Sequence, residues 1–98
     1  MAQNYTVIAI VEAKPEKINT LKDALIKVTR LSRAESSCIE FRLHQDTNNP
    51  AIFILYENWQ SPELHQQQFQ KPYILELLQQ LDDLLAKPFQ GFTAQEIC

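Results

Sequence analysis

The sequence contains very little glycine, cysteine or histidine, and it has no long apolar run. One glycine, two cysteines and two histidines occur among its 98 residues. Cys38 and Cys98 are too far apart for a metal-binding spacing or a disulfide framework, so we expect two reduced thiols. No apolar run approaches the roughly 20 residues of a membrane span, and the first residues lack the basic region of a signal peptide. We therefore expect a cytoplasmic protein with no membrane partner.

A large charge of either sign is also absent. The net charge is -3 at pH 7, and the nine lysines and arginines are scattered along the chain. A nucleic-acid backbone attracts a concentrated basic surface, so a nucleic-acid partner is not expected. The hydrophobic share of 45% is enough for one modest core. We therefore expect residues 1–98 to form one domain.

Four segments are rich in β-branched and aromatic residues, as β-strands typically are. They are residues 5–12, 38–44, 51–59 and 89–97. The second segment alternates, with Ile39, Phe41 and Leu43 on one face and Cys38, Glu40, Arg42 and His44 on the other. The first and third segments are largely apolar on both faces. Glu57 and Trp59 share one face of the third segment, and Asn58 points the other way, toward an interface or the surface.

Three segments have helical signals. Apolar residues recur every three or four positions in residues 15–33 and 74–85, which predicts two amphipathic helices. Between them, Ser61 is a good N-cap and Pro62 a good first helical residue, so a short helix is expected to about Gln70. Leu78 and Leu81 lie in the centre of the last apolar stripe and are expected to face the sheet.

The order strand, helix, strand, strand, helix, strand predicts an α+β fold. It is the ferredoxin-like βαββαβ arrangement, a four-stranded antiparallel sheet with helices on one face. The helices leave the other face uncovered, and an apolar sheet face exposed to water is unfavourable. A second copy packed face to face would cover it. We therefore expect a homodimer through the sheet face, with His44 on the dimer side.

Four stretches resemble the antibiotic biosynthesis monooxygenase family, and its small quinol monooxygenase-like members most closely. They are VIAIVEAKP at 7–15, SSCIEFRLHQD at 36–46, FILYENWQSPE at 53–63 and KPY at 71–73. The resemblance implies a dimeric α+β barrel with a cavity between sheet and helices in each subunit. It also implies a small quinol-like or polyketide-like aromatic substrate, which reacts with oxygen once deprotonated, and no metal or other cofactor.

The same resemblance places candidate site residues on the chain. Members commonly have histidines nine and fourteen residues after the tryptophan, and here Gln68 and Tyr73 occupy those positions after Trp59. His65, one helical turn before Gln68, is then the expected base, because its ordinary pKa lies close to neutrality. Tyr73 and Gln68 would donate hydrogen bonds to the substrate anion, and Glu57 is the second candidate base. The expected pocket lining is Trp59, Gln68 and Phe69.

Each candidate also has an ordinary structural interpretation. Trp59 can serve the core alone, Glu57 can accept structural hydrogen bonds, and His65 can be a solvated helix residue. A non-catalytic dimeric module that binds a small molecule is therefore an alternative to the monooxygenase. Two further enzymatic alternatives are an isomerase of a small carbonyl compound and a haem-degrading enzyme, although no histidine lies at a convincing axial position.

Overall fold

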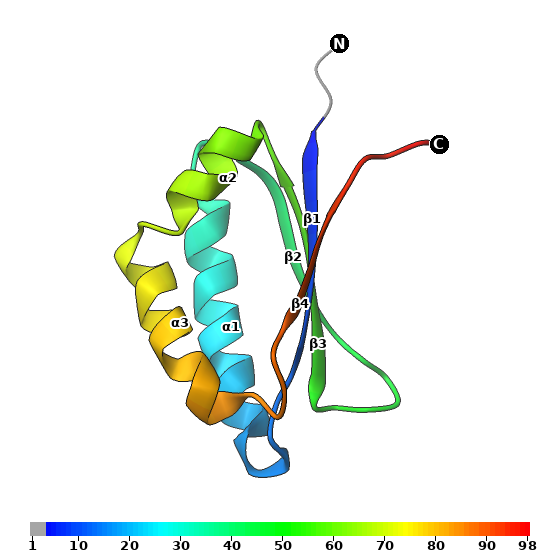
Figure 1. The fold of residues 1–98 in the computed structure, drawn as a ribbon, viewed down its shortest axis with the longest axis vertical. Helices are drawn as coiled ribbons and strands as arrows, with labels where there is room; N and C mark the ends of the chain where they lie inside the picture. The colour runs from blue at the N-terminus through cyan, green and yellow to red at the C-terminus, as the bar shows by residue number, and fades with distance from the viewer. Residues whose placement is uncertain (1–3) are drawn as a thin grey trace.

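A computed structural model describes residues 4–98 of the protein (Figure 1). Within that range it contains four β-strands, three α-helices and one 3-10 turn. They follow in the order β1 (Tyr5–Glu12), η1 (Pro15–Lys17), α1 (Ile18–Arg33), β2 (Cys38–Gln45), β3 (Ile52–Trp59), α2 (Pro62–Gln68), α3 (Pro72–Leu84) and β4 (Gln90–Ala94). All neighbouring strands are antiparallel, in the order β2-β3-β1-β4. This is the predicted ferredoxin-like arrangement, and the fold class is confirmed.

Prolines and one serine set the helix boundaries. Pro15 opens the 3-10 turn ahead of α1, and Pro62 and Pro72 open α2 and α3. Proline is favourable in a first turn because its missing N–H would have no partner there. The Ser61 hydroxyl accepts a hydrogen bond from the Leu64 N–H at 3.2 Å, which confirms the predicted cap. The strand-to-helix junction is therefore specified by its own local chemistry.

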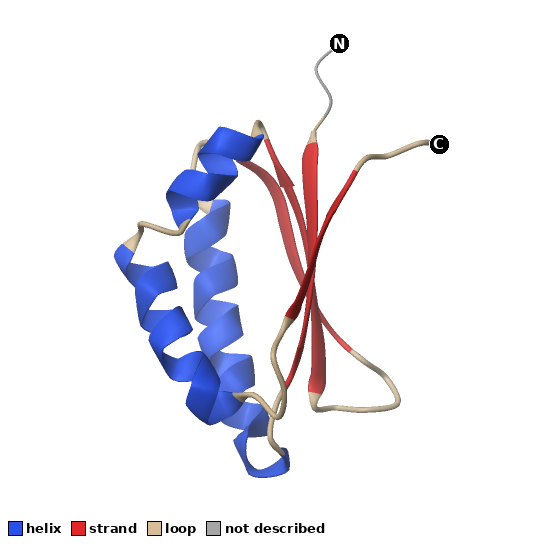
Figure 2. Ribbon diagram, in the orientation of Figure 1, coloured by secondary structure: helices blue, strands red, loops and turns tan. Residues whose placement is uncertain are grey.

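The helices all lie against one face of the sheet, and the other face is bare (Figures 1 and 2). The core between the two layers combines the buried stripe of α1 with the inward side chains of β1 and β3. Trp59 and Leu21 are completely buried, and Phe53 is 1% exposed. Trp59 lies at the end of β3 that leads into α2, whereas Phe53 lies near the start of β3 and Leu21 near the start of α1. The core between helices and sheet is therefore well packed at both ends.

A β-bulge alters the start of β2. The register slips between Cys38 and Glu40, so Cys38 lies opposite Trp59 and packs against the core. Ile39, which alternation placed on the core face, is instead half exposed, so the predicted faces of these two residues are wrong. Burial, with a smaller contribution from Glu57, raises the pKa of the Cys38 thiol to about 11. Cys38 and Cys98 are both free thiols.

The uncovered face of the sheet carries many apolar side chains and one hydrogen-bonded cluster of polar side chains. Thr6 donates a hydrogen bond to the Asn58 side-chain oxygen, and the Asn58 amide donates to Glu40 at 2.9 Å. Arg42 donates to the other Glu40 oxygen. Asn58 is buried rather than at the surface, and its hydrogen bonds compensate for that burial. The apolar side chains on this face include Ile8, Ile10, Ile54, Tyr56 and Phe92.

Helix α3 is less tightly packed than its sequence predicts. Only Ile74 and Leu84 of this helix are buried, and Leu78 is 38% exposed. Leu78 and Leu81 were expected to face the sheet, and both border a hollow between the helix and the sheet, where Leu81 is partly buried against the core. β4 is also shorter than predicted, and the register of its pairing with β1 is unbroken at Gly91.

Candidate functional site

The hollow under α3 is an apolar cavity of about 240 Å³. Its walls come from the sheet and from all three α-helices, so the cavity exists only in the folded chain. Inward residues of β1 and β3 form the floor, and Leu25 and Val28 of α1 form one side. Leucines of α3 and the backbone of β4 enclose the rest. Its few polar side chains are Glu57, His65, Gln68 and Thr93.

Glu57 brings a carboxyl group into this apolar space. It is 6% exposed, and the indole N–H of Trp59 donates a hydrogen bond of 2.9 Å to its Oε1. Burial raises the pKa of Glu57 from 4.5 to about 7, although the Trp59 hydrogen bond lowers it somewhat. The carboxyl group is therefore close to its titration midpoint at neutral pH.

His65 faces Glu57 across the end of the cavity. Its Nε2 lies 3.9 Å from Oε1 of Glu57, which is within ion-pair range but too long for a direct hydrogen bond. Burial lowers the pKa of His65 from its ordinary value of 6.5. Despite the short distance, burial thus favours the neutral form of each partner rather than an ion pair. Titratable groups whose pKa values are shifted by burial in a cleft are a common feature of active sites.

Three aromatic rings hold the His65 imidazole. The centroids of Phe69, Trp59 and Tyr5 lie 5.1, 5.4 and 5.5 Å from its own. The Phe69 ring meets it edge to face. His65 is 9% exposed, so it is not the solvated helix residue that the neighbouring glutamines suggested. Packing of this kind restricts the side-chain rotamers and gives the ring a defined position.

Gln68 lines the cavity but is already engaged. Its side-chain amide donates a hydrogen bond of 2.7 Å to the hydroxyl of Ser32, and both residues are buried. This bond ties α2 to α1 and holds the short helix that carries His65. The contact engages one N–H of the Gln68 amide and leaves its second N–H and its carbonyl oxygen for other partners.

The structure places two other predicted site residues away from the cavity wall. Trp59 lies behind Glu57 and is completely buried, so it reaches the site through its indole hydrogen bond. Tyr73 lies in a separate hollow between α1 and α3, beside Lys27 and Glu76. Its hydroxyl is buried, and no described group pairs with it. His44, on β2, is exposed on the bare face of the sheet.

Several cavity residues were not singled out from the sequence. Phe89, Gly91 and Thr93 border the cavity from β4 and the segment before it. The strand alternation places Gly91 and Thr93 opposite Ala9 and Val7, on the helix side. A glycine on the inward face of a strand leaves room above the sheet, so Gly91 is the one residue of this group whose type points to a cavity.

Among residues 4–98, no three His, Cys, Asp or Glu side chains are grouped closely enough to hold a metal ion. The same part of the chain has no helix with the length and apolar character needed to cross a bilayer.

Comparison with known families agrees with this architecture. The model of the antibiotic biosynthesis monooxygenase family matches residues 4–80. The chain belongs to this family. The match includes both members of the Glu57–His65 pair and the predicted junction, so the resemblance seen in the sequence is confirmed. It stops short of β4, which completes the cavity.

Individual relatives are more distant. Protein sll1783 of Synechocystis sp., which is uncharacterised, is 30% identical over 82 residues, covering 80% of this chain. The chain spans about half of that relative's length, 53%. PA3566 from Pseudomonas aeruginosa superposes with a TM-score of 0.94 at 23% identity, covering 100% of this chain and 98% of that one. A candidate antibiotic biosynthesis monooxygenase from Nitrosomonas europaea has a TM-score of 0.92 at 21% identity, with coverages of 99% and 93%. At these identities the two structures show a shared fold.

Proposed function

We propose that this protein is a monooxygenase that oxidises a small quinol-like or polyketide-like aromatic with molecular oxygen and without a cofactor. The observation that carries the proposal is the buried Glu57–His65 pair at the wall of the apolar cavity. Membership of the monooxygenase family supports it. An engineered cavity of about 150 Å³ holds benzene, so a cavity of about 240 Å³ suits one small ring system.

His65 is the base in this proposal, and Glu57 supplies the opposite charge. The neutral imidazole takes a phenolic proton, and the Glu57 carboxylate stabilises the resulting imidazolium across 3.9 Å. The apolar walls exclude water, which strengthens this interaction. The electron-rich anion then reduces oxygen. One oxygen atom enters the ring and the other leaves as water, so hydroquinone and O₂ give hydroxyquinone and H₂O, and the substrate provides all the electrons.

Oxygen uptake with a panel of hydroquinones tests the proposal. Wild-type activity should rise with pH through about 7, because the pKa of Glu57 sets the supply of carboxylate. His65→Ala and Glu57→Gln should each reduce the rate by about two to four powers of ten, the usual contribution of acid–base catalysis. In Glu57→Gln, the remaining activity should follow His65 and its midpoint should move below 6.5, since burial lowers the pKa of His65. Turnover within about threefold of wild type in His65→Ala would rule this histidine out as the base.

The same pair also supports a second candidate, an isomerase of a small carbonyl compound. The neutral His65 imidazole and the Glu57 carboxyl group, whose pKa is about 7, could remove a proton beside a carbonyl and return it elsewhere. Exchange of substrate hydrogen for deuterium without oxygen uptake would favour the isomerase. Tight binding of hydroquinones with neither reaction would favour the non-catalytic binding module.

We also propose that the protein is a homodimer through the bare face of the sheet. Ile8, Ile10, Ile54, Tyr56 and Phe92 make this face apolar, and Tyr56 and Phe92 are 37% and 50% exposed. A second copy would remove these side chains from water. Sedimentation at micromolar concentration tests this, and a monomer would contradict it.

A further inference from the structure

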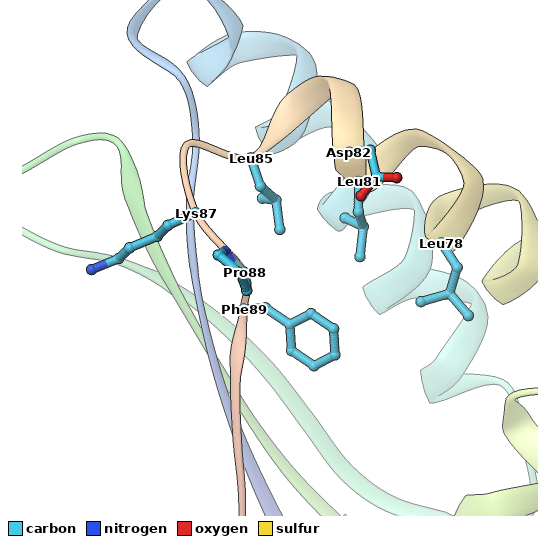
Figure 3. A pocket seen from close by; sticks show the side chains of 7 residues that line it. All are labelled: Leu78, Leu81, Asp82, Leu85, Lys87, Pro88 and Phe89. Atoms are coloured by element: carbon cyan, nitrogen blue, oxygen red, sulfur yellow. The ribbon is translucent and has the colours of Figure 1, made fainter.

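A second hollow adjoins the cavity at the C-terminal end of α3. It measures about 410 Å³ and lies between that helix and the segment leading into β4. Figure 3 shows Leu78, Leu81 and Leu85 on one side and Pro88 and Phe89 on the other, with the Phe89 ring pointing toward the leucines. We call this hollow the tail groove. Its walls are mostly apolar, so it suits an apolar occupant.

The tail groove and the cavity share part of their walls. Leu78, Leu81 and Phe89 line both. Leu78 and Phe89 are 38% and 51% exposed, so large apolar surfaces remain open where the two hollows meet. An apolar group that leaves the cavity would therefore pass directly onto these side chains.

Two charged residues, Lys87 and Asp82, border the tail groove. Lys87 points away from the leucines (Figure 3), and its ammonium group lies 3.7 Å from the carboxylate of Glu12. The remaining charge is the carboxylate of Asp82. A negatively charged chain would lose its hydration in this groove without gaining an inward-facing cation, and the walls are otherwise mostly leucine, proline and phenylalanine, so an uncharged apolar chain is favoured.

We propose that the tail groove binds an apolar chain attached to the aromatic ring that occupies the cavity. The substrate class is then a ring hydroxyl compound with an alkyl or similarly apolar substituent. This inference rests on the proposed function, because it takes the cavity as the substrate site. The ring reaches the Glu57–His65 pair, and its substituent packs against Leu78, Leu81 and Phe89.

Calorimetric binding of methylhydroquinone and hexylhydroquinone, measured without oxygen, tests the inference. Each buried methylene is worth up to about fourfold in affinity, so the hexyl compound should bind at least about tenfold more tightly to the wild type. The lack of such a gain would overturn the inference.

Paired variants test whether the tighter binding of hexylhydroquinone depends on the tail groove. Asp82 lines the tail groove, whereas its neighbour Asp83 lies 3.3 Å from Lys17 and lines none of the described hollows. In Asp82→Trp the indole ring should fill part of the tail groove, so hexylhydroquinone should bind less than about threefold more tightly than methylhydroquinone. Asp83→Trp makes the same change of charge and should keep the full difference in affinity. Pro88→Asp offers a second exposed position, where a new carboxylate should also remove the gain. An equal gain in wild type and all three variants would overturn the inference.

The outcomes separate this inference from the proposed function. A groove-dependent hexyl gain without oxygen uptake would leave the groove assignment standing and refute the oxygenase. Turnover of methylhydroquinone with no hexyl gain would support the oxygenase and refute the groove assignment.

Discussion

Helices α1 and α3 lie on the same face of the sheet and have similar leucine patterns, yet they pack on it differently. Leu21, Leu25 and Val28 of α1 are all at most 4% exposed. In α3 only Ile74 and Leu84 are buried, and Leu78 is 38% exposed, although both helices line the same cavity. Two similar apolar helix faces can thus differ in how tightly they are packed.

The largest expected effect tests this difference in packing. Leu21→Ala should lower the free energy of unfolding by about 2 to 5 kcal/mol, because it opens a cavity in a packed region. Leu81→Ala should cost less than about 1.5 kcal/mol, since Leu81 already borders open space. Denaturant titration measures both. Equal losses would mean that α3 is as tightly packed as α1.

The second prediction concerns the carboxyl group of Glu57, which lines the cavity under α3. The raised pKa of Glu57 means that the folded protein holds this proton more tightly than the unfolded chain. Ionisation therefore costs no stability below about pH 4.5, an increasing amount up to about pH 7, and a constant amount of roughly 3 kcal/mol above that. Glu57→Gln cannot ionise and should be more stable than wild type by up to roughly that amount near pH 8, and by little near pH 4.

Glu40, on the bare face, is the matched control. Hydrogen bonds from Arg42 and Asn58 lower its pKa below 4.5. Its ionised form therefore adds stability above about pH 4.5, and this contribution is lost as the pH falls through the lowered pKa. Glu40→Gln should be less stable than wild type at neutral pH, the opposite sign to Glu57→Gln. The same sign in both variants, from thermal unfolding across pH, would contradict these environments.

The third prediction concerns Gly91→Val, which should fill part of the cavity without disturbing the fold. Gly91 has no positive φ, and an added Cβ would lie 3.8 Å from Phe89, an ordinary contact. Gly91→Val should therefore change stability by less than about 1 kcal/mol, while binding of methylhydroquinone should weaken by about tenfold or more through overpacking. Thr93→Val, on the same face, keeps the side-chain volume and should bind nearly as wild type does. Unchanged binding in Gly91→Val would place the ligand elsewhere.

The smallest expected effect concerns the ion pair between the two helices. Lys27 and Glu76 lie 3.5 Å apart, and both side chains are more than half exposed. Lys27→Ala should cost less than about 1 kcal/mol, and the loss should shrink in high salt. Denaturant titration at low and high salt measures it. A larger, salt-independent loss would show that this pair, rather than apolar contact, holds α3 to α1.

Much of the fold could be predicted because it depends on local patterns. Apolar periodicity, Pro15, Pro62 and Pro72, and the Ser61 cap specify where elements begin and what type they are. The shared face of Glu57 and Trp59 follows from strand alternation, and the structure adds the hydrogen bond between them. The bulge at Cys38 could not be predicted, because it depends on how β2 pairs with β3 rather than on its own alternation.

The order of elements, the ferredoxin-like fold and the family could all be read from local patterns in the sequence. The sequence also singled out Glu57, His65, Gln68 and Phe69, all of which line the cavity. Three features depend on the tertiary structure: Glu57 and His65 lie 3.9 Å apart, burial raises the pKa of Glu57 to about 7, and α3 leaves a cavity beneath it. Periodicity shows which side of an element is apolar. The distance between layers and the loss of water around a charge depend on contacts between residues far apart in the chain.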